Sequence, residues 1–226
     1  MKITYYGHNC FLFESDTRFL SDPFITKNPL AAAMNVDNIK TDHILLTHGH
    51  GDHIADLRQI ASNNDAQIIA MVEVAQWFES SGQANTNGIN FGGTVKLTNT
   101  TSVKYVQAHH SSSLPDGSYG GNPGSFIIKS EGKTIFLAGD TSLHYDMKMF
   151  GELYRFDIAI LPIGGHYTMD FYDATHAARY LKVHRVIGCH YDSFPAIKID
   201  HAVAMKTFEE ANLELILPEI EQSINL

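Results

Sequence analysis

The sequence predicts an α/β (α+β) protein in which two mixed β-sheets pack face to face, with helices outside both. Three observations lead to this prediction. Antiparallel pairs of short apolar strands occur in each half, strand–helix–strand units also occur in each half, and no linker or low-complexity tract divides the 226 residues. We therefore expect a single domain that covers residues 1–226.

Apolar patterns and turn residues define the expected elements of the first half. Strands are expected within residues 2–13, with a turn at Gly7, and at residues 17–20, 43–46 and 67–71. Apolar residues at helical spacing predict helices over residues 54–61 and 72–80, the second ended by Gly82. The alternation after residue 43 is typical of βαβ-like units.

The second half repeats this organisation. Paired strands are expected at residues 94–97 and 102–107, and a hairpin at residues 125–129 and 133–138. Between these pairs lies SSSLPDGSYGGNPG, whose glycines, prolines and serines predict an irregular loop. Further strands are expected at 157–162, 185–189 and 213–217, and helices at 174–181 and 202–211.

Composition narrows the classes of function. Hydrophobic residues make up 44% and charged residues 18% of the chain, as in ordinary globular proteins. No window reaches the roughly 18 apolar residues of a membrane span, and no secretory signal is visible, so we expect a cytoplasmic protein without a membrane partner. The two cysteines lie in apolar runs and are expected to be buried free thiols.

The charge of the chain bears on its partners. The formal net charge is −9, and no run rich in lysine or arginine occurs, which argues against an extended nucleic-acid surface. A small-molecule substrate is expected. It can be anionic, because bound divalent ions would make the site locally positive.

The strongest chemical signal is THGHGDH at residues 47–53, directly after an apolar strand. Neutral imidazole and carboxylate bind zinc and its first-row neighbours, and they need a stiff backbone to fix their geometry. His48 and His50 lie two apart, so they point the same way on an extended segment. Asp52 and His53 lie where the chain turns into a helix, and can face a second metal. We interpret this segment as a metal site, not as a polar turn that is rich in histidine.

Three further ligand candidates also stand at strand ends. They are His110, Asp140 and His190, each of which follows an expected strand. Gly139 lets the backbone beside Asp140 come close to the metals. A lone histidine at a strand end is more often a hydrogen-bonded surface residue, but the recurrence of such positions favours a shared site. The strands that end at His48 and Asp140 are alike, which suggests an internal duplication.

The order of these motifs resembles the metallo-β-lactamase superfamily: H-x-H-x-D-H after an apolar strand, a His before Ser, G-D-T, and a strand-end His. Shorter matches resemble the small metal-dependent hydrolases related to ascorbate-6-phosphate lactonase, namely YGHNC at 6–10, SDPF at 21–24, HSS at 110–112, LPIGG at 161–165 and HY at 190–191. The resemblance covers essentially the whole chain. It implies a four-layer αβ/βα sandwich, which the element pattern also suggests.

The resemblance further implies a dinuclear centre. It assigns His48, His50 and His110 to metal one, Asp52, His53 and His190 to metal two, and Asp140 to the bridge between them. Zinc is the first expectation, although manganese, iron and nickel also suit a set without thiolates.

Several candidate residues keep alternative interpretations. Adjacent strand residues point to opposite faces, so only one of His109 and His110 reaches the metals, and the resemblance favours His110. His166, where the family would have a non-ligating residue, is a catalytic acid, an extra ligand or a loop residue. His8 is expected to line or support the site, and Asp22 to orient a ligand imidazole or to cap a turn. The remaining histidines are interpreted as structural: His43, His144, His176, His184 and His201.

Such a centre predicts hydrolysis. Two neighbouring divalent ions can share a water and lower its pKa toward neutrality, which gives a hydroxide that attacks a small ester, lactone or phosphoester. Asp52 would help to orient it, His166 is the best-placed proton donor for the leaving group, and the loop at 111–124 would overhang the site. The alternatives are a phosphodiesterase or nuclease, for which a basic exosite is missing, and a non-hydrolytic or sensor role. β-Lactam hydrolysis is not expected without a sign of export.

Overall fold

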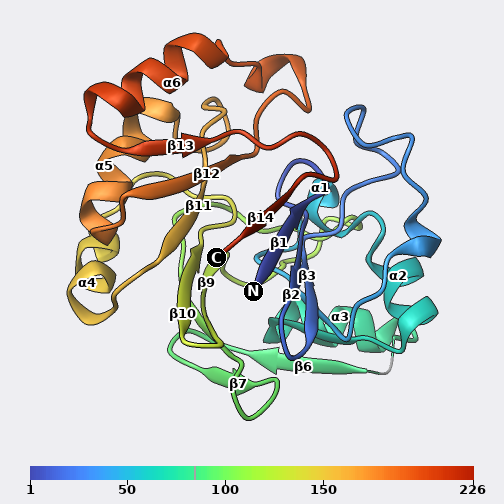
Figure 1. Ribbon diagram of the computed structural model, residues 1–226. Coiled ribbons are helices and arrows are strands. Elements are labelled where there is room, and N and C mark those ends of the chain that lie inside the picture. The colour runs from blue at the N-terminus through green and yellow to red at the C-terminus, as the bar shows by residue number, and fades with distance from the viewer. Residues whose placement is uncertain (84) are drawn as a thin grey trace.

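Two seven-stranded sheets form the centre of the computed structural model, which describes residues 1–83 and 85–226 (Figure 1). In the first sheet the strand order is β14 (Ser223–Asn225), β1 (Lys2–Tyr5), β2 (Phe11–Glu14), β3 (Arg18–Ser21), β4 (His43–Leu45), β5 (Gln67–Met71) and β6 (Thr86–Ile89). In the second it is β13 (Glu214–Ile216), β12 (Arg185–Cys189), β11 (Ile158–Pro162), β10 (Lys133–Leu137), β9 (Gly124–Ser130), β8 (Ser102–Gln107) and β7 (Thr94–Lys96).

The two sheets share one pattern of strand directions. In the first, β1, β2 and β3 are antiparallel neighbours, and β3 to β6 are parallel. In the second, β7 to β10 are antiparallel, and β10 to β13 are parallel. This likeness agrees with the internal duplication suggested by the sequence. The C-terminal β14 then returns to pair with β1, so the two chain ends lie side by side.

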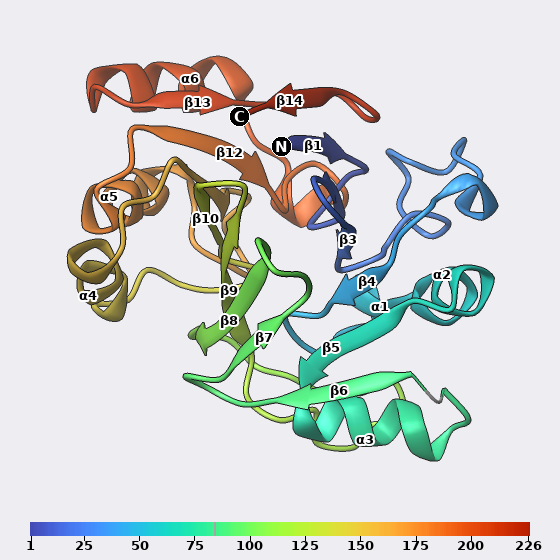
Figure 2. The same cartoon turned by 60° about the horizontal axis from the view of Figure 1, so that its bottom comes forward.

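Helices cover the outer face of each sheet, as Figure 2 shows. On the first sheet these are α2 (Leu57–Asn64) and α3 (Val72–Ser80), and on the second they are α4 (Asp146–Leu153), α5 (Phe171–Leu181) and α6 (His201–Glu210). Two 3₁₀ turns, Val36–Asn38 and Pro195–Ile197, lie in the loops. Within the described residues no helix is both long enough and apolar enough to span a bilayer.

Alternation along the strands explains this layering. Ile135 and Leu137 of β10 pack into the core between the sheets, whereas Phe136 packs into a second core beneath α4, α5 and α6. All three side chains are fully buried. Successive strand residues point to opposite faces, so a strand that is apolar at every position requires cover on both sides. The predicted fold class, two mixed sheets with helices outside both, is confirmed.

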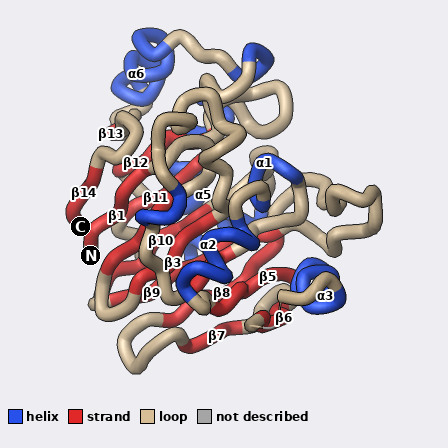
Figure 3. The backbone as a smooth tube through the Cα atoms, turned by 90° about the vertical axis from the view of Figure 1, so that its right-hand side faces the viewer, coloured by secondary structure: helices blue, strands red, loops and turns tan. Residues whose placement is uncertain are grey.

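Some local predictions were wrong. The helix expected at 54–61 is divided into α1 (Gly51–Ile54) and α2, because Asp56 accepts hydrogen bonds from the backbone N–H groups of Ile25 and Thr26 at 2.6 and 3.0 Å. The short α1 lies among the loops beyond the strand ends (Figure 3). Three elements, β6, α4 and β14, were not predicted from the sequence. Cys10 and Cys189 are buried free thiols, as expected.

Candidate metal centre

The ends of strands from both sheets bring the predicted ligands together. His48 and His50 follow β4, His110 follows β8, Asp140 follows β10 and His190 follows β12. The crevice beyond the carboxyl ends of parallel strands is where α/β folds place ligands. Asp52 and His53 enter the same space from α1, for which His50 is the N-terminal cap residue.

One group of possible ligands consists of His48, His50 and His110, each of which offers a nitrogen within 4.8 Å of the others. His48 Nε2 lies 2.9 Å from His50 Nδ1, and the His110 ring centroid is 5.1 Å from both other rings. His48 is buried, whereas His50 and His110 are partly exposed. This group therefore faces the solvent on one side.

A second group lies deeper and consists of His8, Asp52, His53 and His190. His8, His53 and His190 are buried, and the Asp52 side chain is 29% exposed. The His8 ring lies 3.9 Å from the His190 ring, centroid to centroid.

Asp140 lies between the two groups. Its Oδ1 is 3.4 Å from His53 Nε2, and its Oδ2 is 2.9 Å from His190 Nε2 and 3.5 Å from His110 Nε2. Asp140 is buried and also forms a ligand group with His48 and His53. One carboxylate thus touches histidines of both groups, as the bridging position implied by the resemblance requires.

The polar atoms at the centre fit metal ions better than they fit one another. His53 Nε2 and both ring nitrogens of His190 are buried without a hydrogen-bond partner among the described residues, although Asp140 lies close to both rings. Leaving such groups unpaired costs about 1–3 kcal/mol each. Coordination to a divalent cation would satisfy these nitrogens and the carboxylate together. The residues present therefore fit a metal.

In His48 and His53, hydrogen bonds occupy the Nδ1 atom and leave the Nε2 atom available to a metal ion. Asp22 is buried, and its Oδ2 accepts from Thr47 Oγ1 at 2.7 Å and from His53 Nδ1 at 2.9 Å. Because Thr47 donates to Asp22, its hydroxyl oxygen accepts from His48 Nδ1 at 3.0 Å. In their neutral forms both rings carry their proton on Nδ1 and present a lone pair on Nε2. Asp22 thus orients the imidazole of His53, and its role in orienting a metal ligand stays a prediction.

Burial shifts the protonation of the first group. It lowers the pKa of His48 well below the ordinary value, and His53 adds to this shift. Burial likewise lowers the pKa of His50 and of His110. These three rings are neutral at pH 7, which is the form that binds metals.

At the centre, attraction between histidines and carboxylates outweighs the effect of burial on the pKa values of His53 and Asp140. Burial alone would lower the pKa of His53, but the carboxylates of Asp140 and Asp22 outweigh it and raise this pKa well above its usual range. Burial would raise the pKa of Asp140, yet His190 and His53 hold it well below its ordinary value. A cation that binds here would replace the proton of His53 while Asp140 stays ionised.

His8 donates a hydrogen bond from Nε2 to Asp52 Oδ2 at 3.2 Å, and its Nδ1 lies 3.0 Å from Ser193 Oγ. Burial lowers the pKa of His8 to about 4, so the ring is neutral at pH 7. An ionised carboxylate only accepts, so the single ring proton lies on Nε2, and Nδ1 accepts from Ser193. This arrangement holds Asp52 in place and leaves His8 without a free lone pair for a metal.

Two polar residues that hold the candidate ligands and their neighbours, Asn9 and Ser193, were not predicted from the sequence. Asn9 Nδ2 donates to Asp140 Oδ1 at 2.6 Å, and Asn9 is fully buried. In the sequence, Asn9 stands out only as part of the YGHNC motif. An asparagine directly after Gly7-His8 was the available signal, whereas nothing near Ser193 points toward His8 until the chain is folded.

Two histidines differ from the other candidates. His166 is exposed, packs against Tyr167 at a ring distance of 4.5 Å and belongs to none of the ligand groups among the described residues. Its φ of 56° places it in a tight turn after Gly165. His144, which the sequence analysis interpreted as structural, stacks its ring on that of His109 with centroids 4.4 Å apart, and its role stays a prediction.

The loop at 111–124 packs against the first ligand group. Ser112 Oγ accepts a hydrogen bond from the Gly49 N–H at 3.1 Å, and Ser111 Oγ lies 3.5 Å from His50 Nε2. A Cβ added at Gly49 would lie 3.1 Å from Leu114. A larger residue at position 49 would push this loop away from the ligand segment by a few tenths of an ångström.

Comparison with known proteins agrees with this geometry. The family model described as "Beta-lactamase superfamily domain" matches residues 17–191. The chain is 45% identical over 227 residues to a "UPF0173 metal-dependent hydrolase" of Flavobacterium johnsoniae, with all of both chains covered. It is 40% identical to a protein of the same description from Thermoplasma volcanium, over 100% of this chain and 99% of that one.

Solved structures share the fold. A metallo hydrolase from the archaeon Ignicoccus hospitalis aligns with a TM-score of 0.89 and 34% identity, over 99% of this chain and 97% of that one. An isothiocyanate hydrolase from Delia radicum gut bacteria aligns with a TM-score of 0.82 over 100% and 99% of the two chains. Its 18% identity is evidence for the fold alone.

Proposed function

The chain belongs to the beta-lactamase superfamily and to the family of UPF0173 metal-dependent hydrolases, and from this premise we propose that its centre holds two divalent ions and hydrolyses a small ester, lactone or phosphoester. The observation that carries the proposal is the position of Asp140. Its carboxylate lies within 3.5 Å of His110, which belongs to one proposed ligand set, and of His53 and His190, which belong to the other, so one carboxylate can serve two ions.

The proposed ligand set divides the residues as the resemblance implies. His48, His50 and His110 would hold one ion, Asp52, His53 and His190 would hold the other, and Asp140 would contribute to both. Zinc is the first candidate for both, and manganese, iron and nickel suit the same donors. When bound, the ions would supply Lewis acidity and a water nucleophile at neutral pH.

The residues around the ions have separate tasks. Asn9 and Asp22 hold the carboxylate and the imidazoles in position through buried hydrogen bonds. His8 fixes one oxygen of Asp52, and this partly exposed carboxylate is the group that we assign to orient the attacking water. These contacts fix the geometry in advance, which catalysis at a preorganised site requires.

The substrate enters from the side of His50, Asp52 and His110, because their side chains are the partly exposed ones of the centre. The loop at 111–124 borders this side through Ser111 and Ser112. We propose that this loop limits the site to small substrates. Bound cations would attract an anionic group despite the net charge of −9.

Departure of a poor leaving group requires a proton, and we propose His166 as its donor. His166 belongs to none of the ligand groups among the described residues, so the structure does not support its interpretation as an extra metal ligand. Its exposed ring on the turn after Gly165 is free to approach a substrate. The remaining alternative is a loop residue without a role, and leaving-group dependence separates these two interpretations.

Two other functions use the same residues. A phosphodiesterase acting on nucleic acid would bind its substrate through a basic surface, which an excess of 25 acidic over 16 basic residues disfavours. A non-hydrolytic metal-binding or sensor role would keep the ions without turnover. Activity on small substrates is therefore the measurement that decides among the three.

The test combines metal analysis with a screen of lactones, phosphodiesters and thioesters on zinc- and manganese-loaded protein. We expect hydrolysis of a small substrate that is lost in Asp140→Ala and kept in His176→Asn, a change at an exposed histidine of α5. Cleavage of oligonucleotides instead would establish the nuclease. Bound ions without any turnover would support the sensor role and overturn the proposal.

A further inference from the structure

A second cluster of possible metal ligands lies outside the centre described above. His109, His144 and Asp146 each offer a ligand atom within 4.8 Å of the other two. None of them belongs to the proposed ligand set. His109 follows β8, and Asp146 is the first residue of α4.

Buried polar atoms in this cluster are unexplained. His144 is 4% exposed, and neither of its ring nitrogens has a hydrogen-bond partner among the described residues. Its ring stacks on that of His109, with centroids 4.4 Å apart and planes inclined by 14°. Packing alone would keep the two rings together but leave both buried nitrogens unpaired, which costs free energy.

The geometry suits a first-row divalent ion. The rings of His109 and His144 are as close as those of His48 and His50, at 4.4 and 4.5 Å, but their planes are inclined by 14° and not by 78°, so one ring must turn to direct a nitrogen at a shared ion. Donors around tetrahedral zinc lie about 3.4 Å from one another, given bonds of about 2.0–2.1 Å to nitrogen. The three ligand atoms lie within 4.8 Å of one another, so side-chain rotation, without movement of the backbone, would bring them to this spacing. Two imidazoles and a carboxylate are also the donors found in open, three-ligand zinc sites.

The surroundings hold the three residues near one another. The His109 N–H donates to Thr141 Oγ1 at 3.0 Å, and the Ser142 N–H donates to the His109 carbonyl at 3.1 Å. These bonds join the end of β8 to the segment that leads from Asp140 into α4. The cluster therefore rests on backbone that is fixed independently of any ion.

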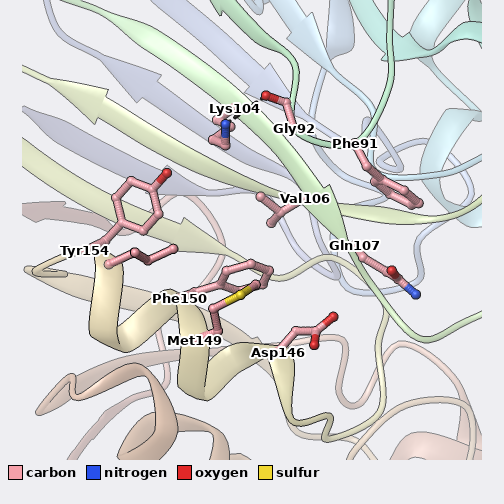
Figure 4. A pocket seen from close by; sticks show the side chains of 10 residues that line it. Phe91, Gly92, Lys104, Val106, Gln107, Asp146, Met149, Phe150 and Tyr154 are labelled. Carbon is pink, nitrogen blue, oxygen red and sulfur yellow. Dashed lines mark hydrogen bonds between the residues drawn. The ribbon is translucent and has the colours of Figure 1, made fainter.

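One side of the cluster is open. Asp146 also lies at the edge of a cavity of about 270 Å³ between α4 and β8, where it stands near Gln107 (Figure 4). His109 is itself exposed. Water or a small ligand can therefore occupy the fourth position on an ion held by the three side chains.

We propose that His109, His144 and Asp146 form an additional site for one zinc-like divalent ion, separate from the centre at Asp140. The ion would connect the residue beside His110 to the start of α4, and so brace the segment that carries Asp140. The site makes no use of the hydrolytic residues. Its existence is therefore independent of the proposed function.

The experiment measures zinc per chain in the full-length protein after loading and buffer exchange. His144→Phe keeps an aromatic ring in the buried position but removes both nitrogens, and Asp146→Ala removes the carboxylate. The matched control is His43→Phe, because His43 Nδ1 is also buried without a partner among the described residues and His43 belongs to none of their ligand groups. We expect one ion fewer in each of the first two variants, and no loss in His43→Phe.

Two further measurements make the outcome specific. Asp140→Ala should lose ions at the main centre and keep the additional one. Diffraction data from zinc-loaded crystals, recorded at the zinc absorption edge, should show an anomalous peak between His109, His144 and Asp146. The same stoichiometry in the parent, His144→Phe and Asp146→Ala, or anomalous peaks confined to the main centre, would overturn the proposal. Should His144→Phe fail to fold, Asp146→Ala and the exposed His109→Ala decide.

Discussion

Asn9 Nδ2 donates a 2.6 Å hydrogen bond to Asp140 Oδ1, which joins residues that lie 131 positions apart. Asn9 lies in the turn between β1 and β2 of the first sheet, and Asp140 follows β10 of the second. Both residues are buried. The carboxylate that faces both ligand groups is thus held by the opposite sheet, and the centre exists only when the two sheets are packed together.

Loss of this bond should weaken metal binding. Asn9→Ala leaves one oxygen of Asp140 without its donor, and loss of a residue that orients a ligand typically lowers metal affinity about 10–100-fold. We expect a decrease in this range, measured by competition with a chromophoric chelator. The control is Asn63→Ala, which removes an exposed bond to Asp37. Equal affinities in both variants would show that Asn9 does not position the carboxylate.

Strand patterns and the candidate ligands at strand ends could be predicted because they depend on local sequence. The apolar run before His48 specifies a buried strand, and the spacing of the histidines and the aspartate after this strand is typical of metal ligands. The β6 strand was missed because it is short, polar and rich in turn residues (TNGI), and it pairs with only one described neighbour, β5. A sequence of this kind forms a strand only when an edge is already available.

The parts of the site that sequence did not predict are contacts across the fold. Asn9 reaches Asp140, and Ser193 reaches His8 across 185 residues, through sheet packing that no local pattern encodes. The convergence of His109 and His144 has the same origin. The single domain over residues 1–226 stays a prediction, although both sheets contribute to the core that lies between them.

The main centre should hold two ions. Because the additional site would add to the total, the count is made in the His144→Phe background, where we expect two equivalents of zinc by elemental analysis. Asp140→Ala in that background should lower the count toward zero, since one carboxylate serves both groups. A count of one equivalent of zinc in His144→Phe, with Asp140 intact, would support a mononuclear centre. A value near zero that zinc titration does not restore would exclude the centre.

The adjacent histidines should behave differently. In the His144→Phe background, His110→Ala removes a nitrogen that lies 3.5 Å from Asp140 Oδ2, so we expect fewer ions and at least about a tenfold loss of activity, the lower limit typical of changes around a metal site. His109→Ala in the same background should leave the ion count and the activity close to those of His144→Phe alone. The reason is that the His109 ring packs against residue 144 and does not face the main centre. Loss of ions and activity in His109→Ala but not in His110→Ala would mean that His109, and not His110, is the ligand of the main centre.

Acid should destabilise the protein through Asp16. Hydrogen bonds from Thr100, Thr101 and Thr98 hold the pKa of Asp16 well below its ordinary value of 3.8. A carboxyl with a lowered pKa in the folded state stabilises the fold above the unfolded pKa, and this contribution disappears as pH falls through the folded pKa. Asp16→Asn should therefore lower Tm at pH 7 by more than at pH 3. A Tm difference that is independent of pH would contradict this origin.

Catalysis by His166 should depend on the leaving group. If its ring protonates the departing oxygen, His166→Gln should keep the parent ion content and slow alkyl esters or alkyl phosphodiesters by roughly 10²–10⁴-fold. Aryl esters with good leaving groups need no proton, so their rates should stay near those of the parent. The control is His184→Asn, another exposed histidine, which should change neither class of substrate. Equal slowing of both classes together with lost ions would make His166 a ligand, and unchanged rates would make it a loop residue.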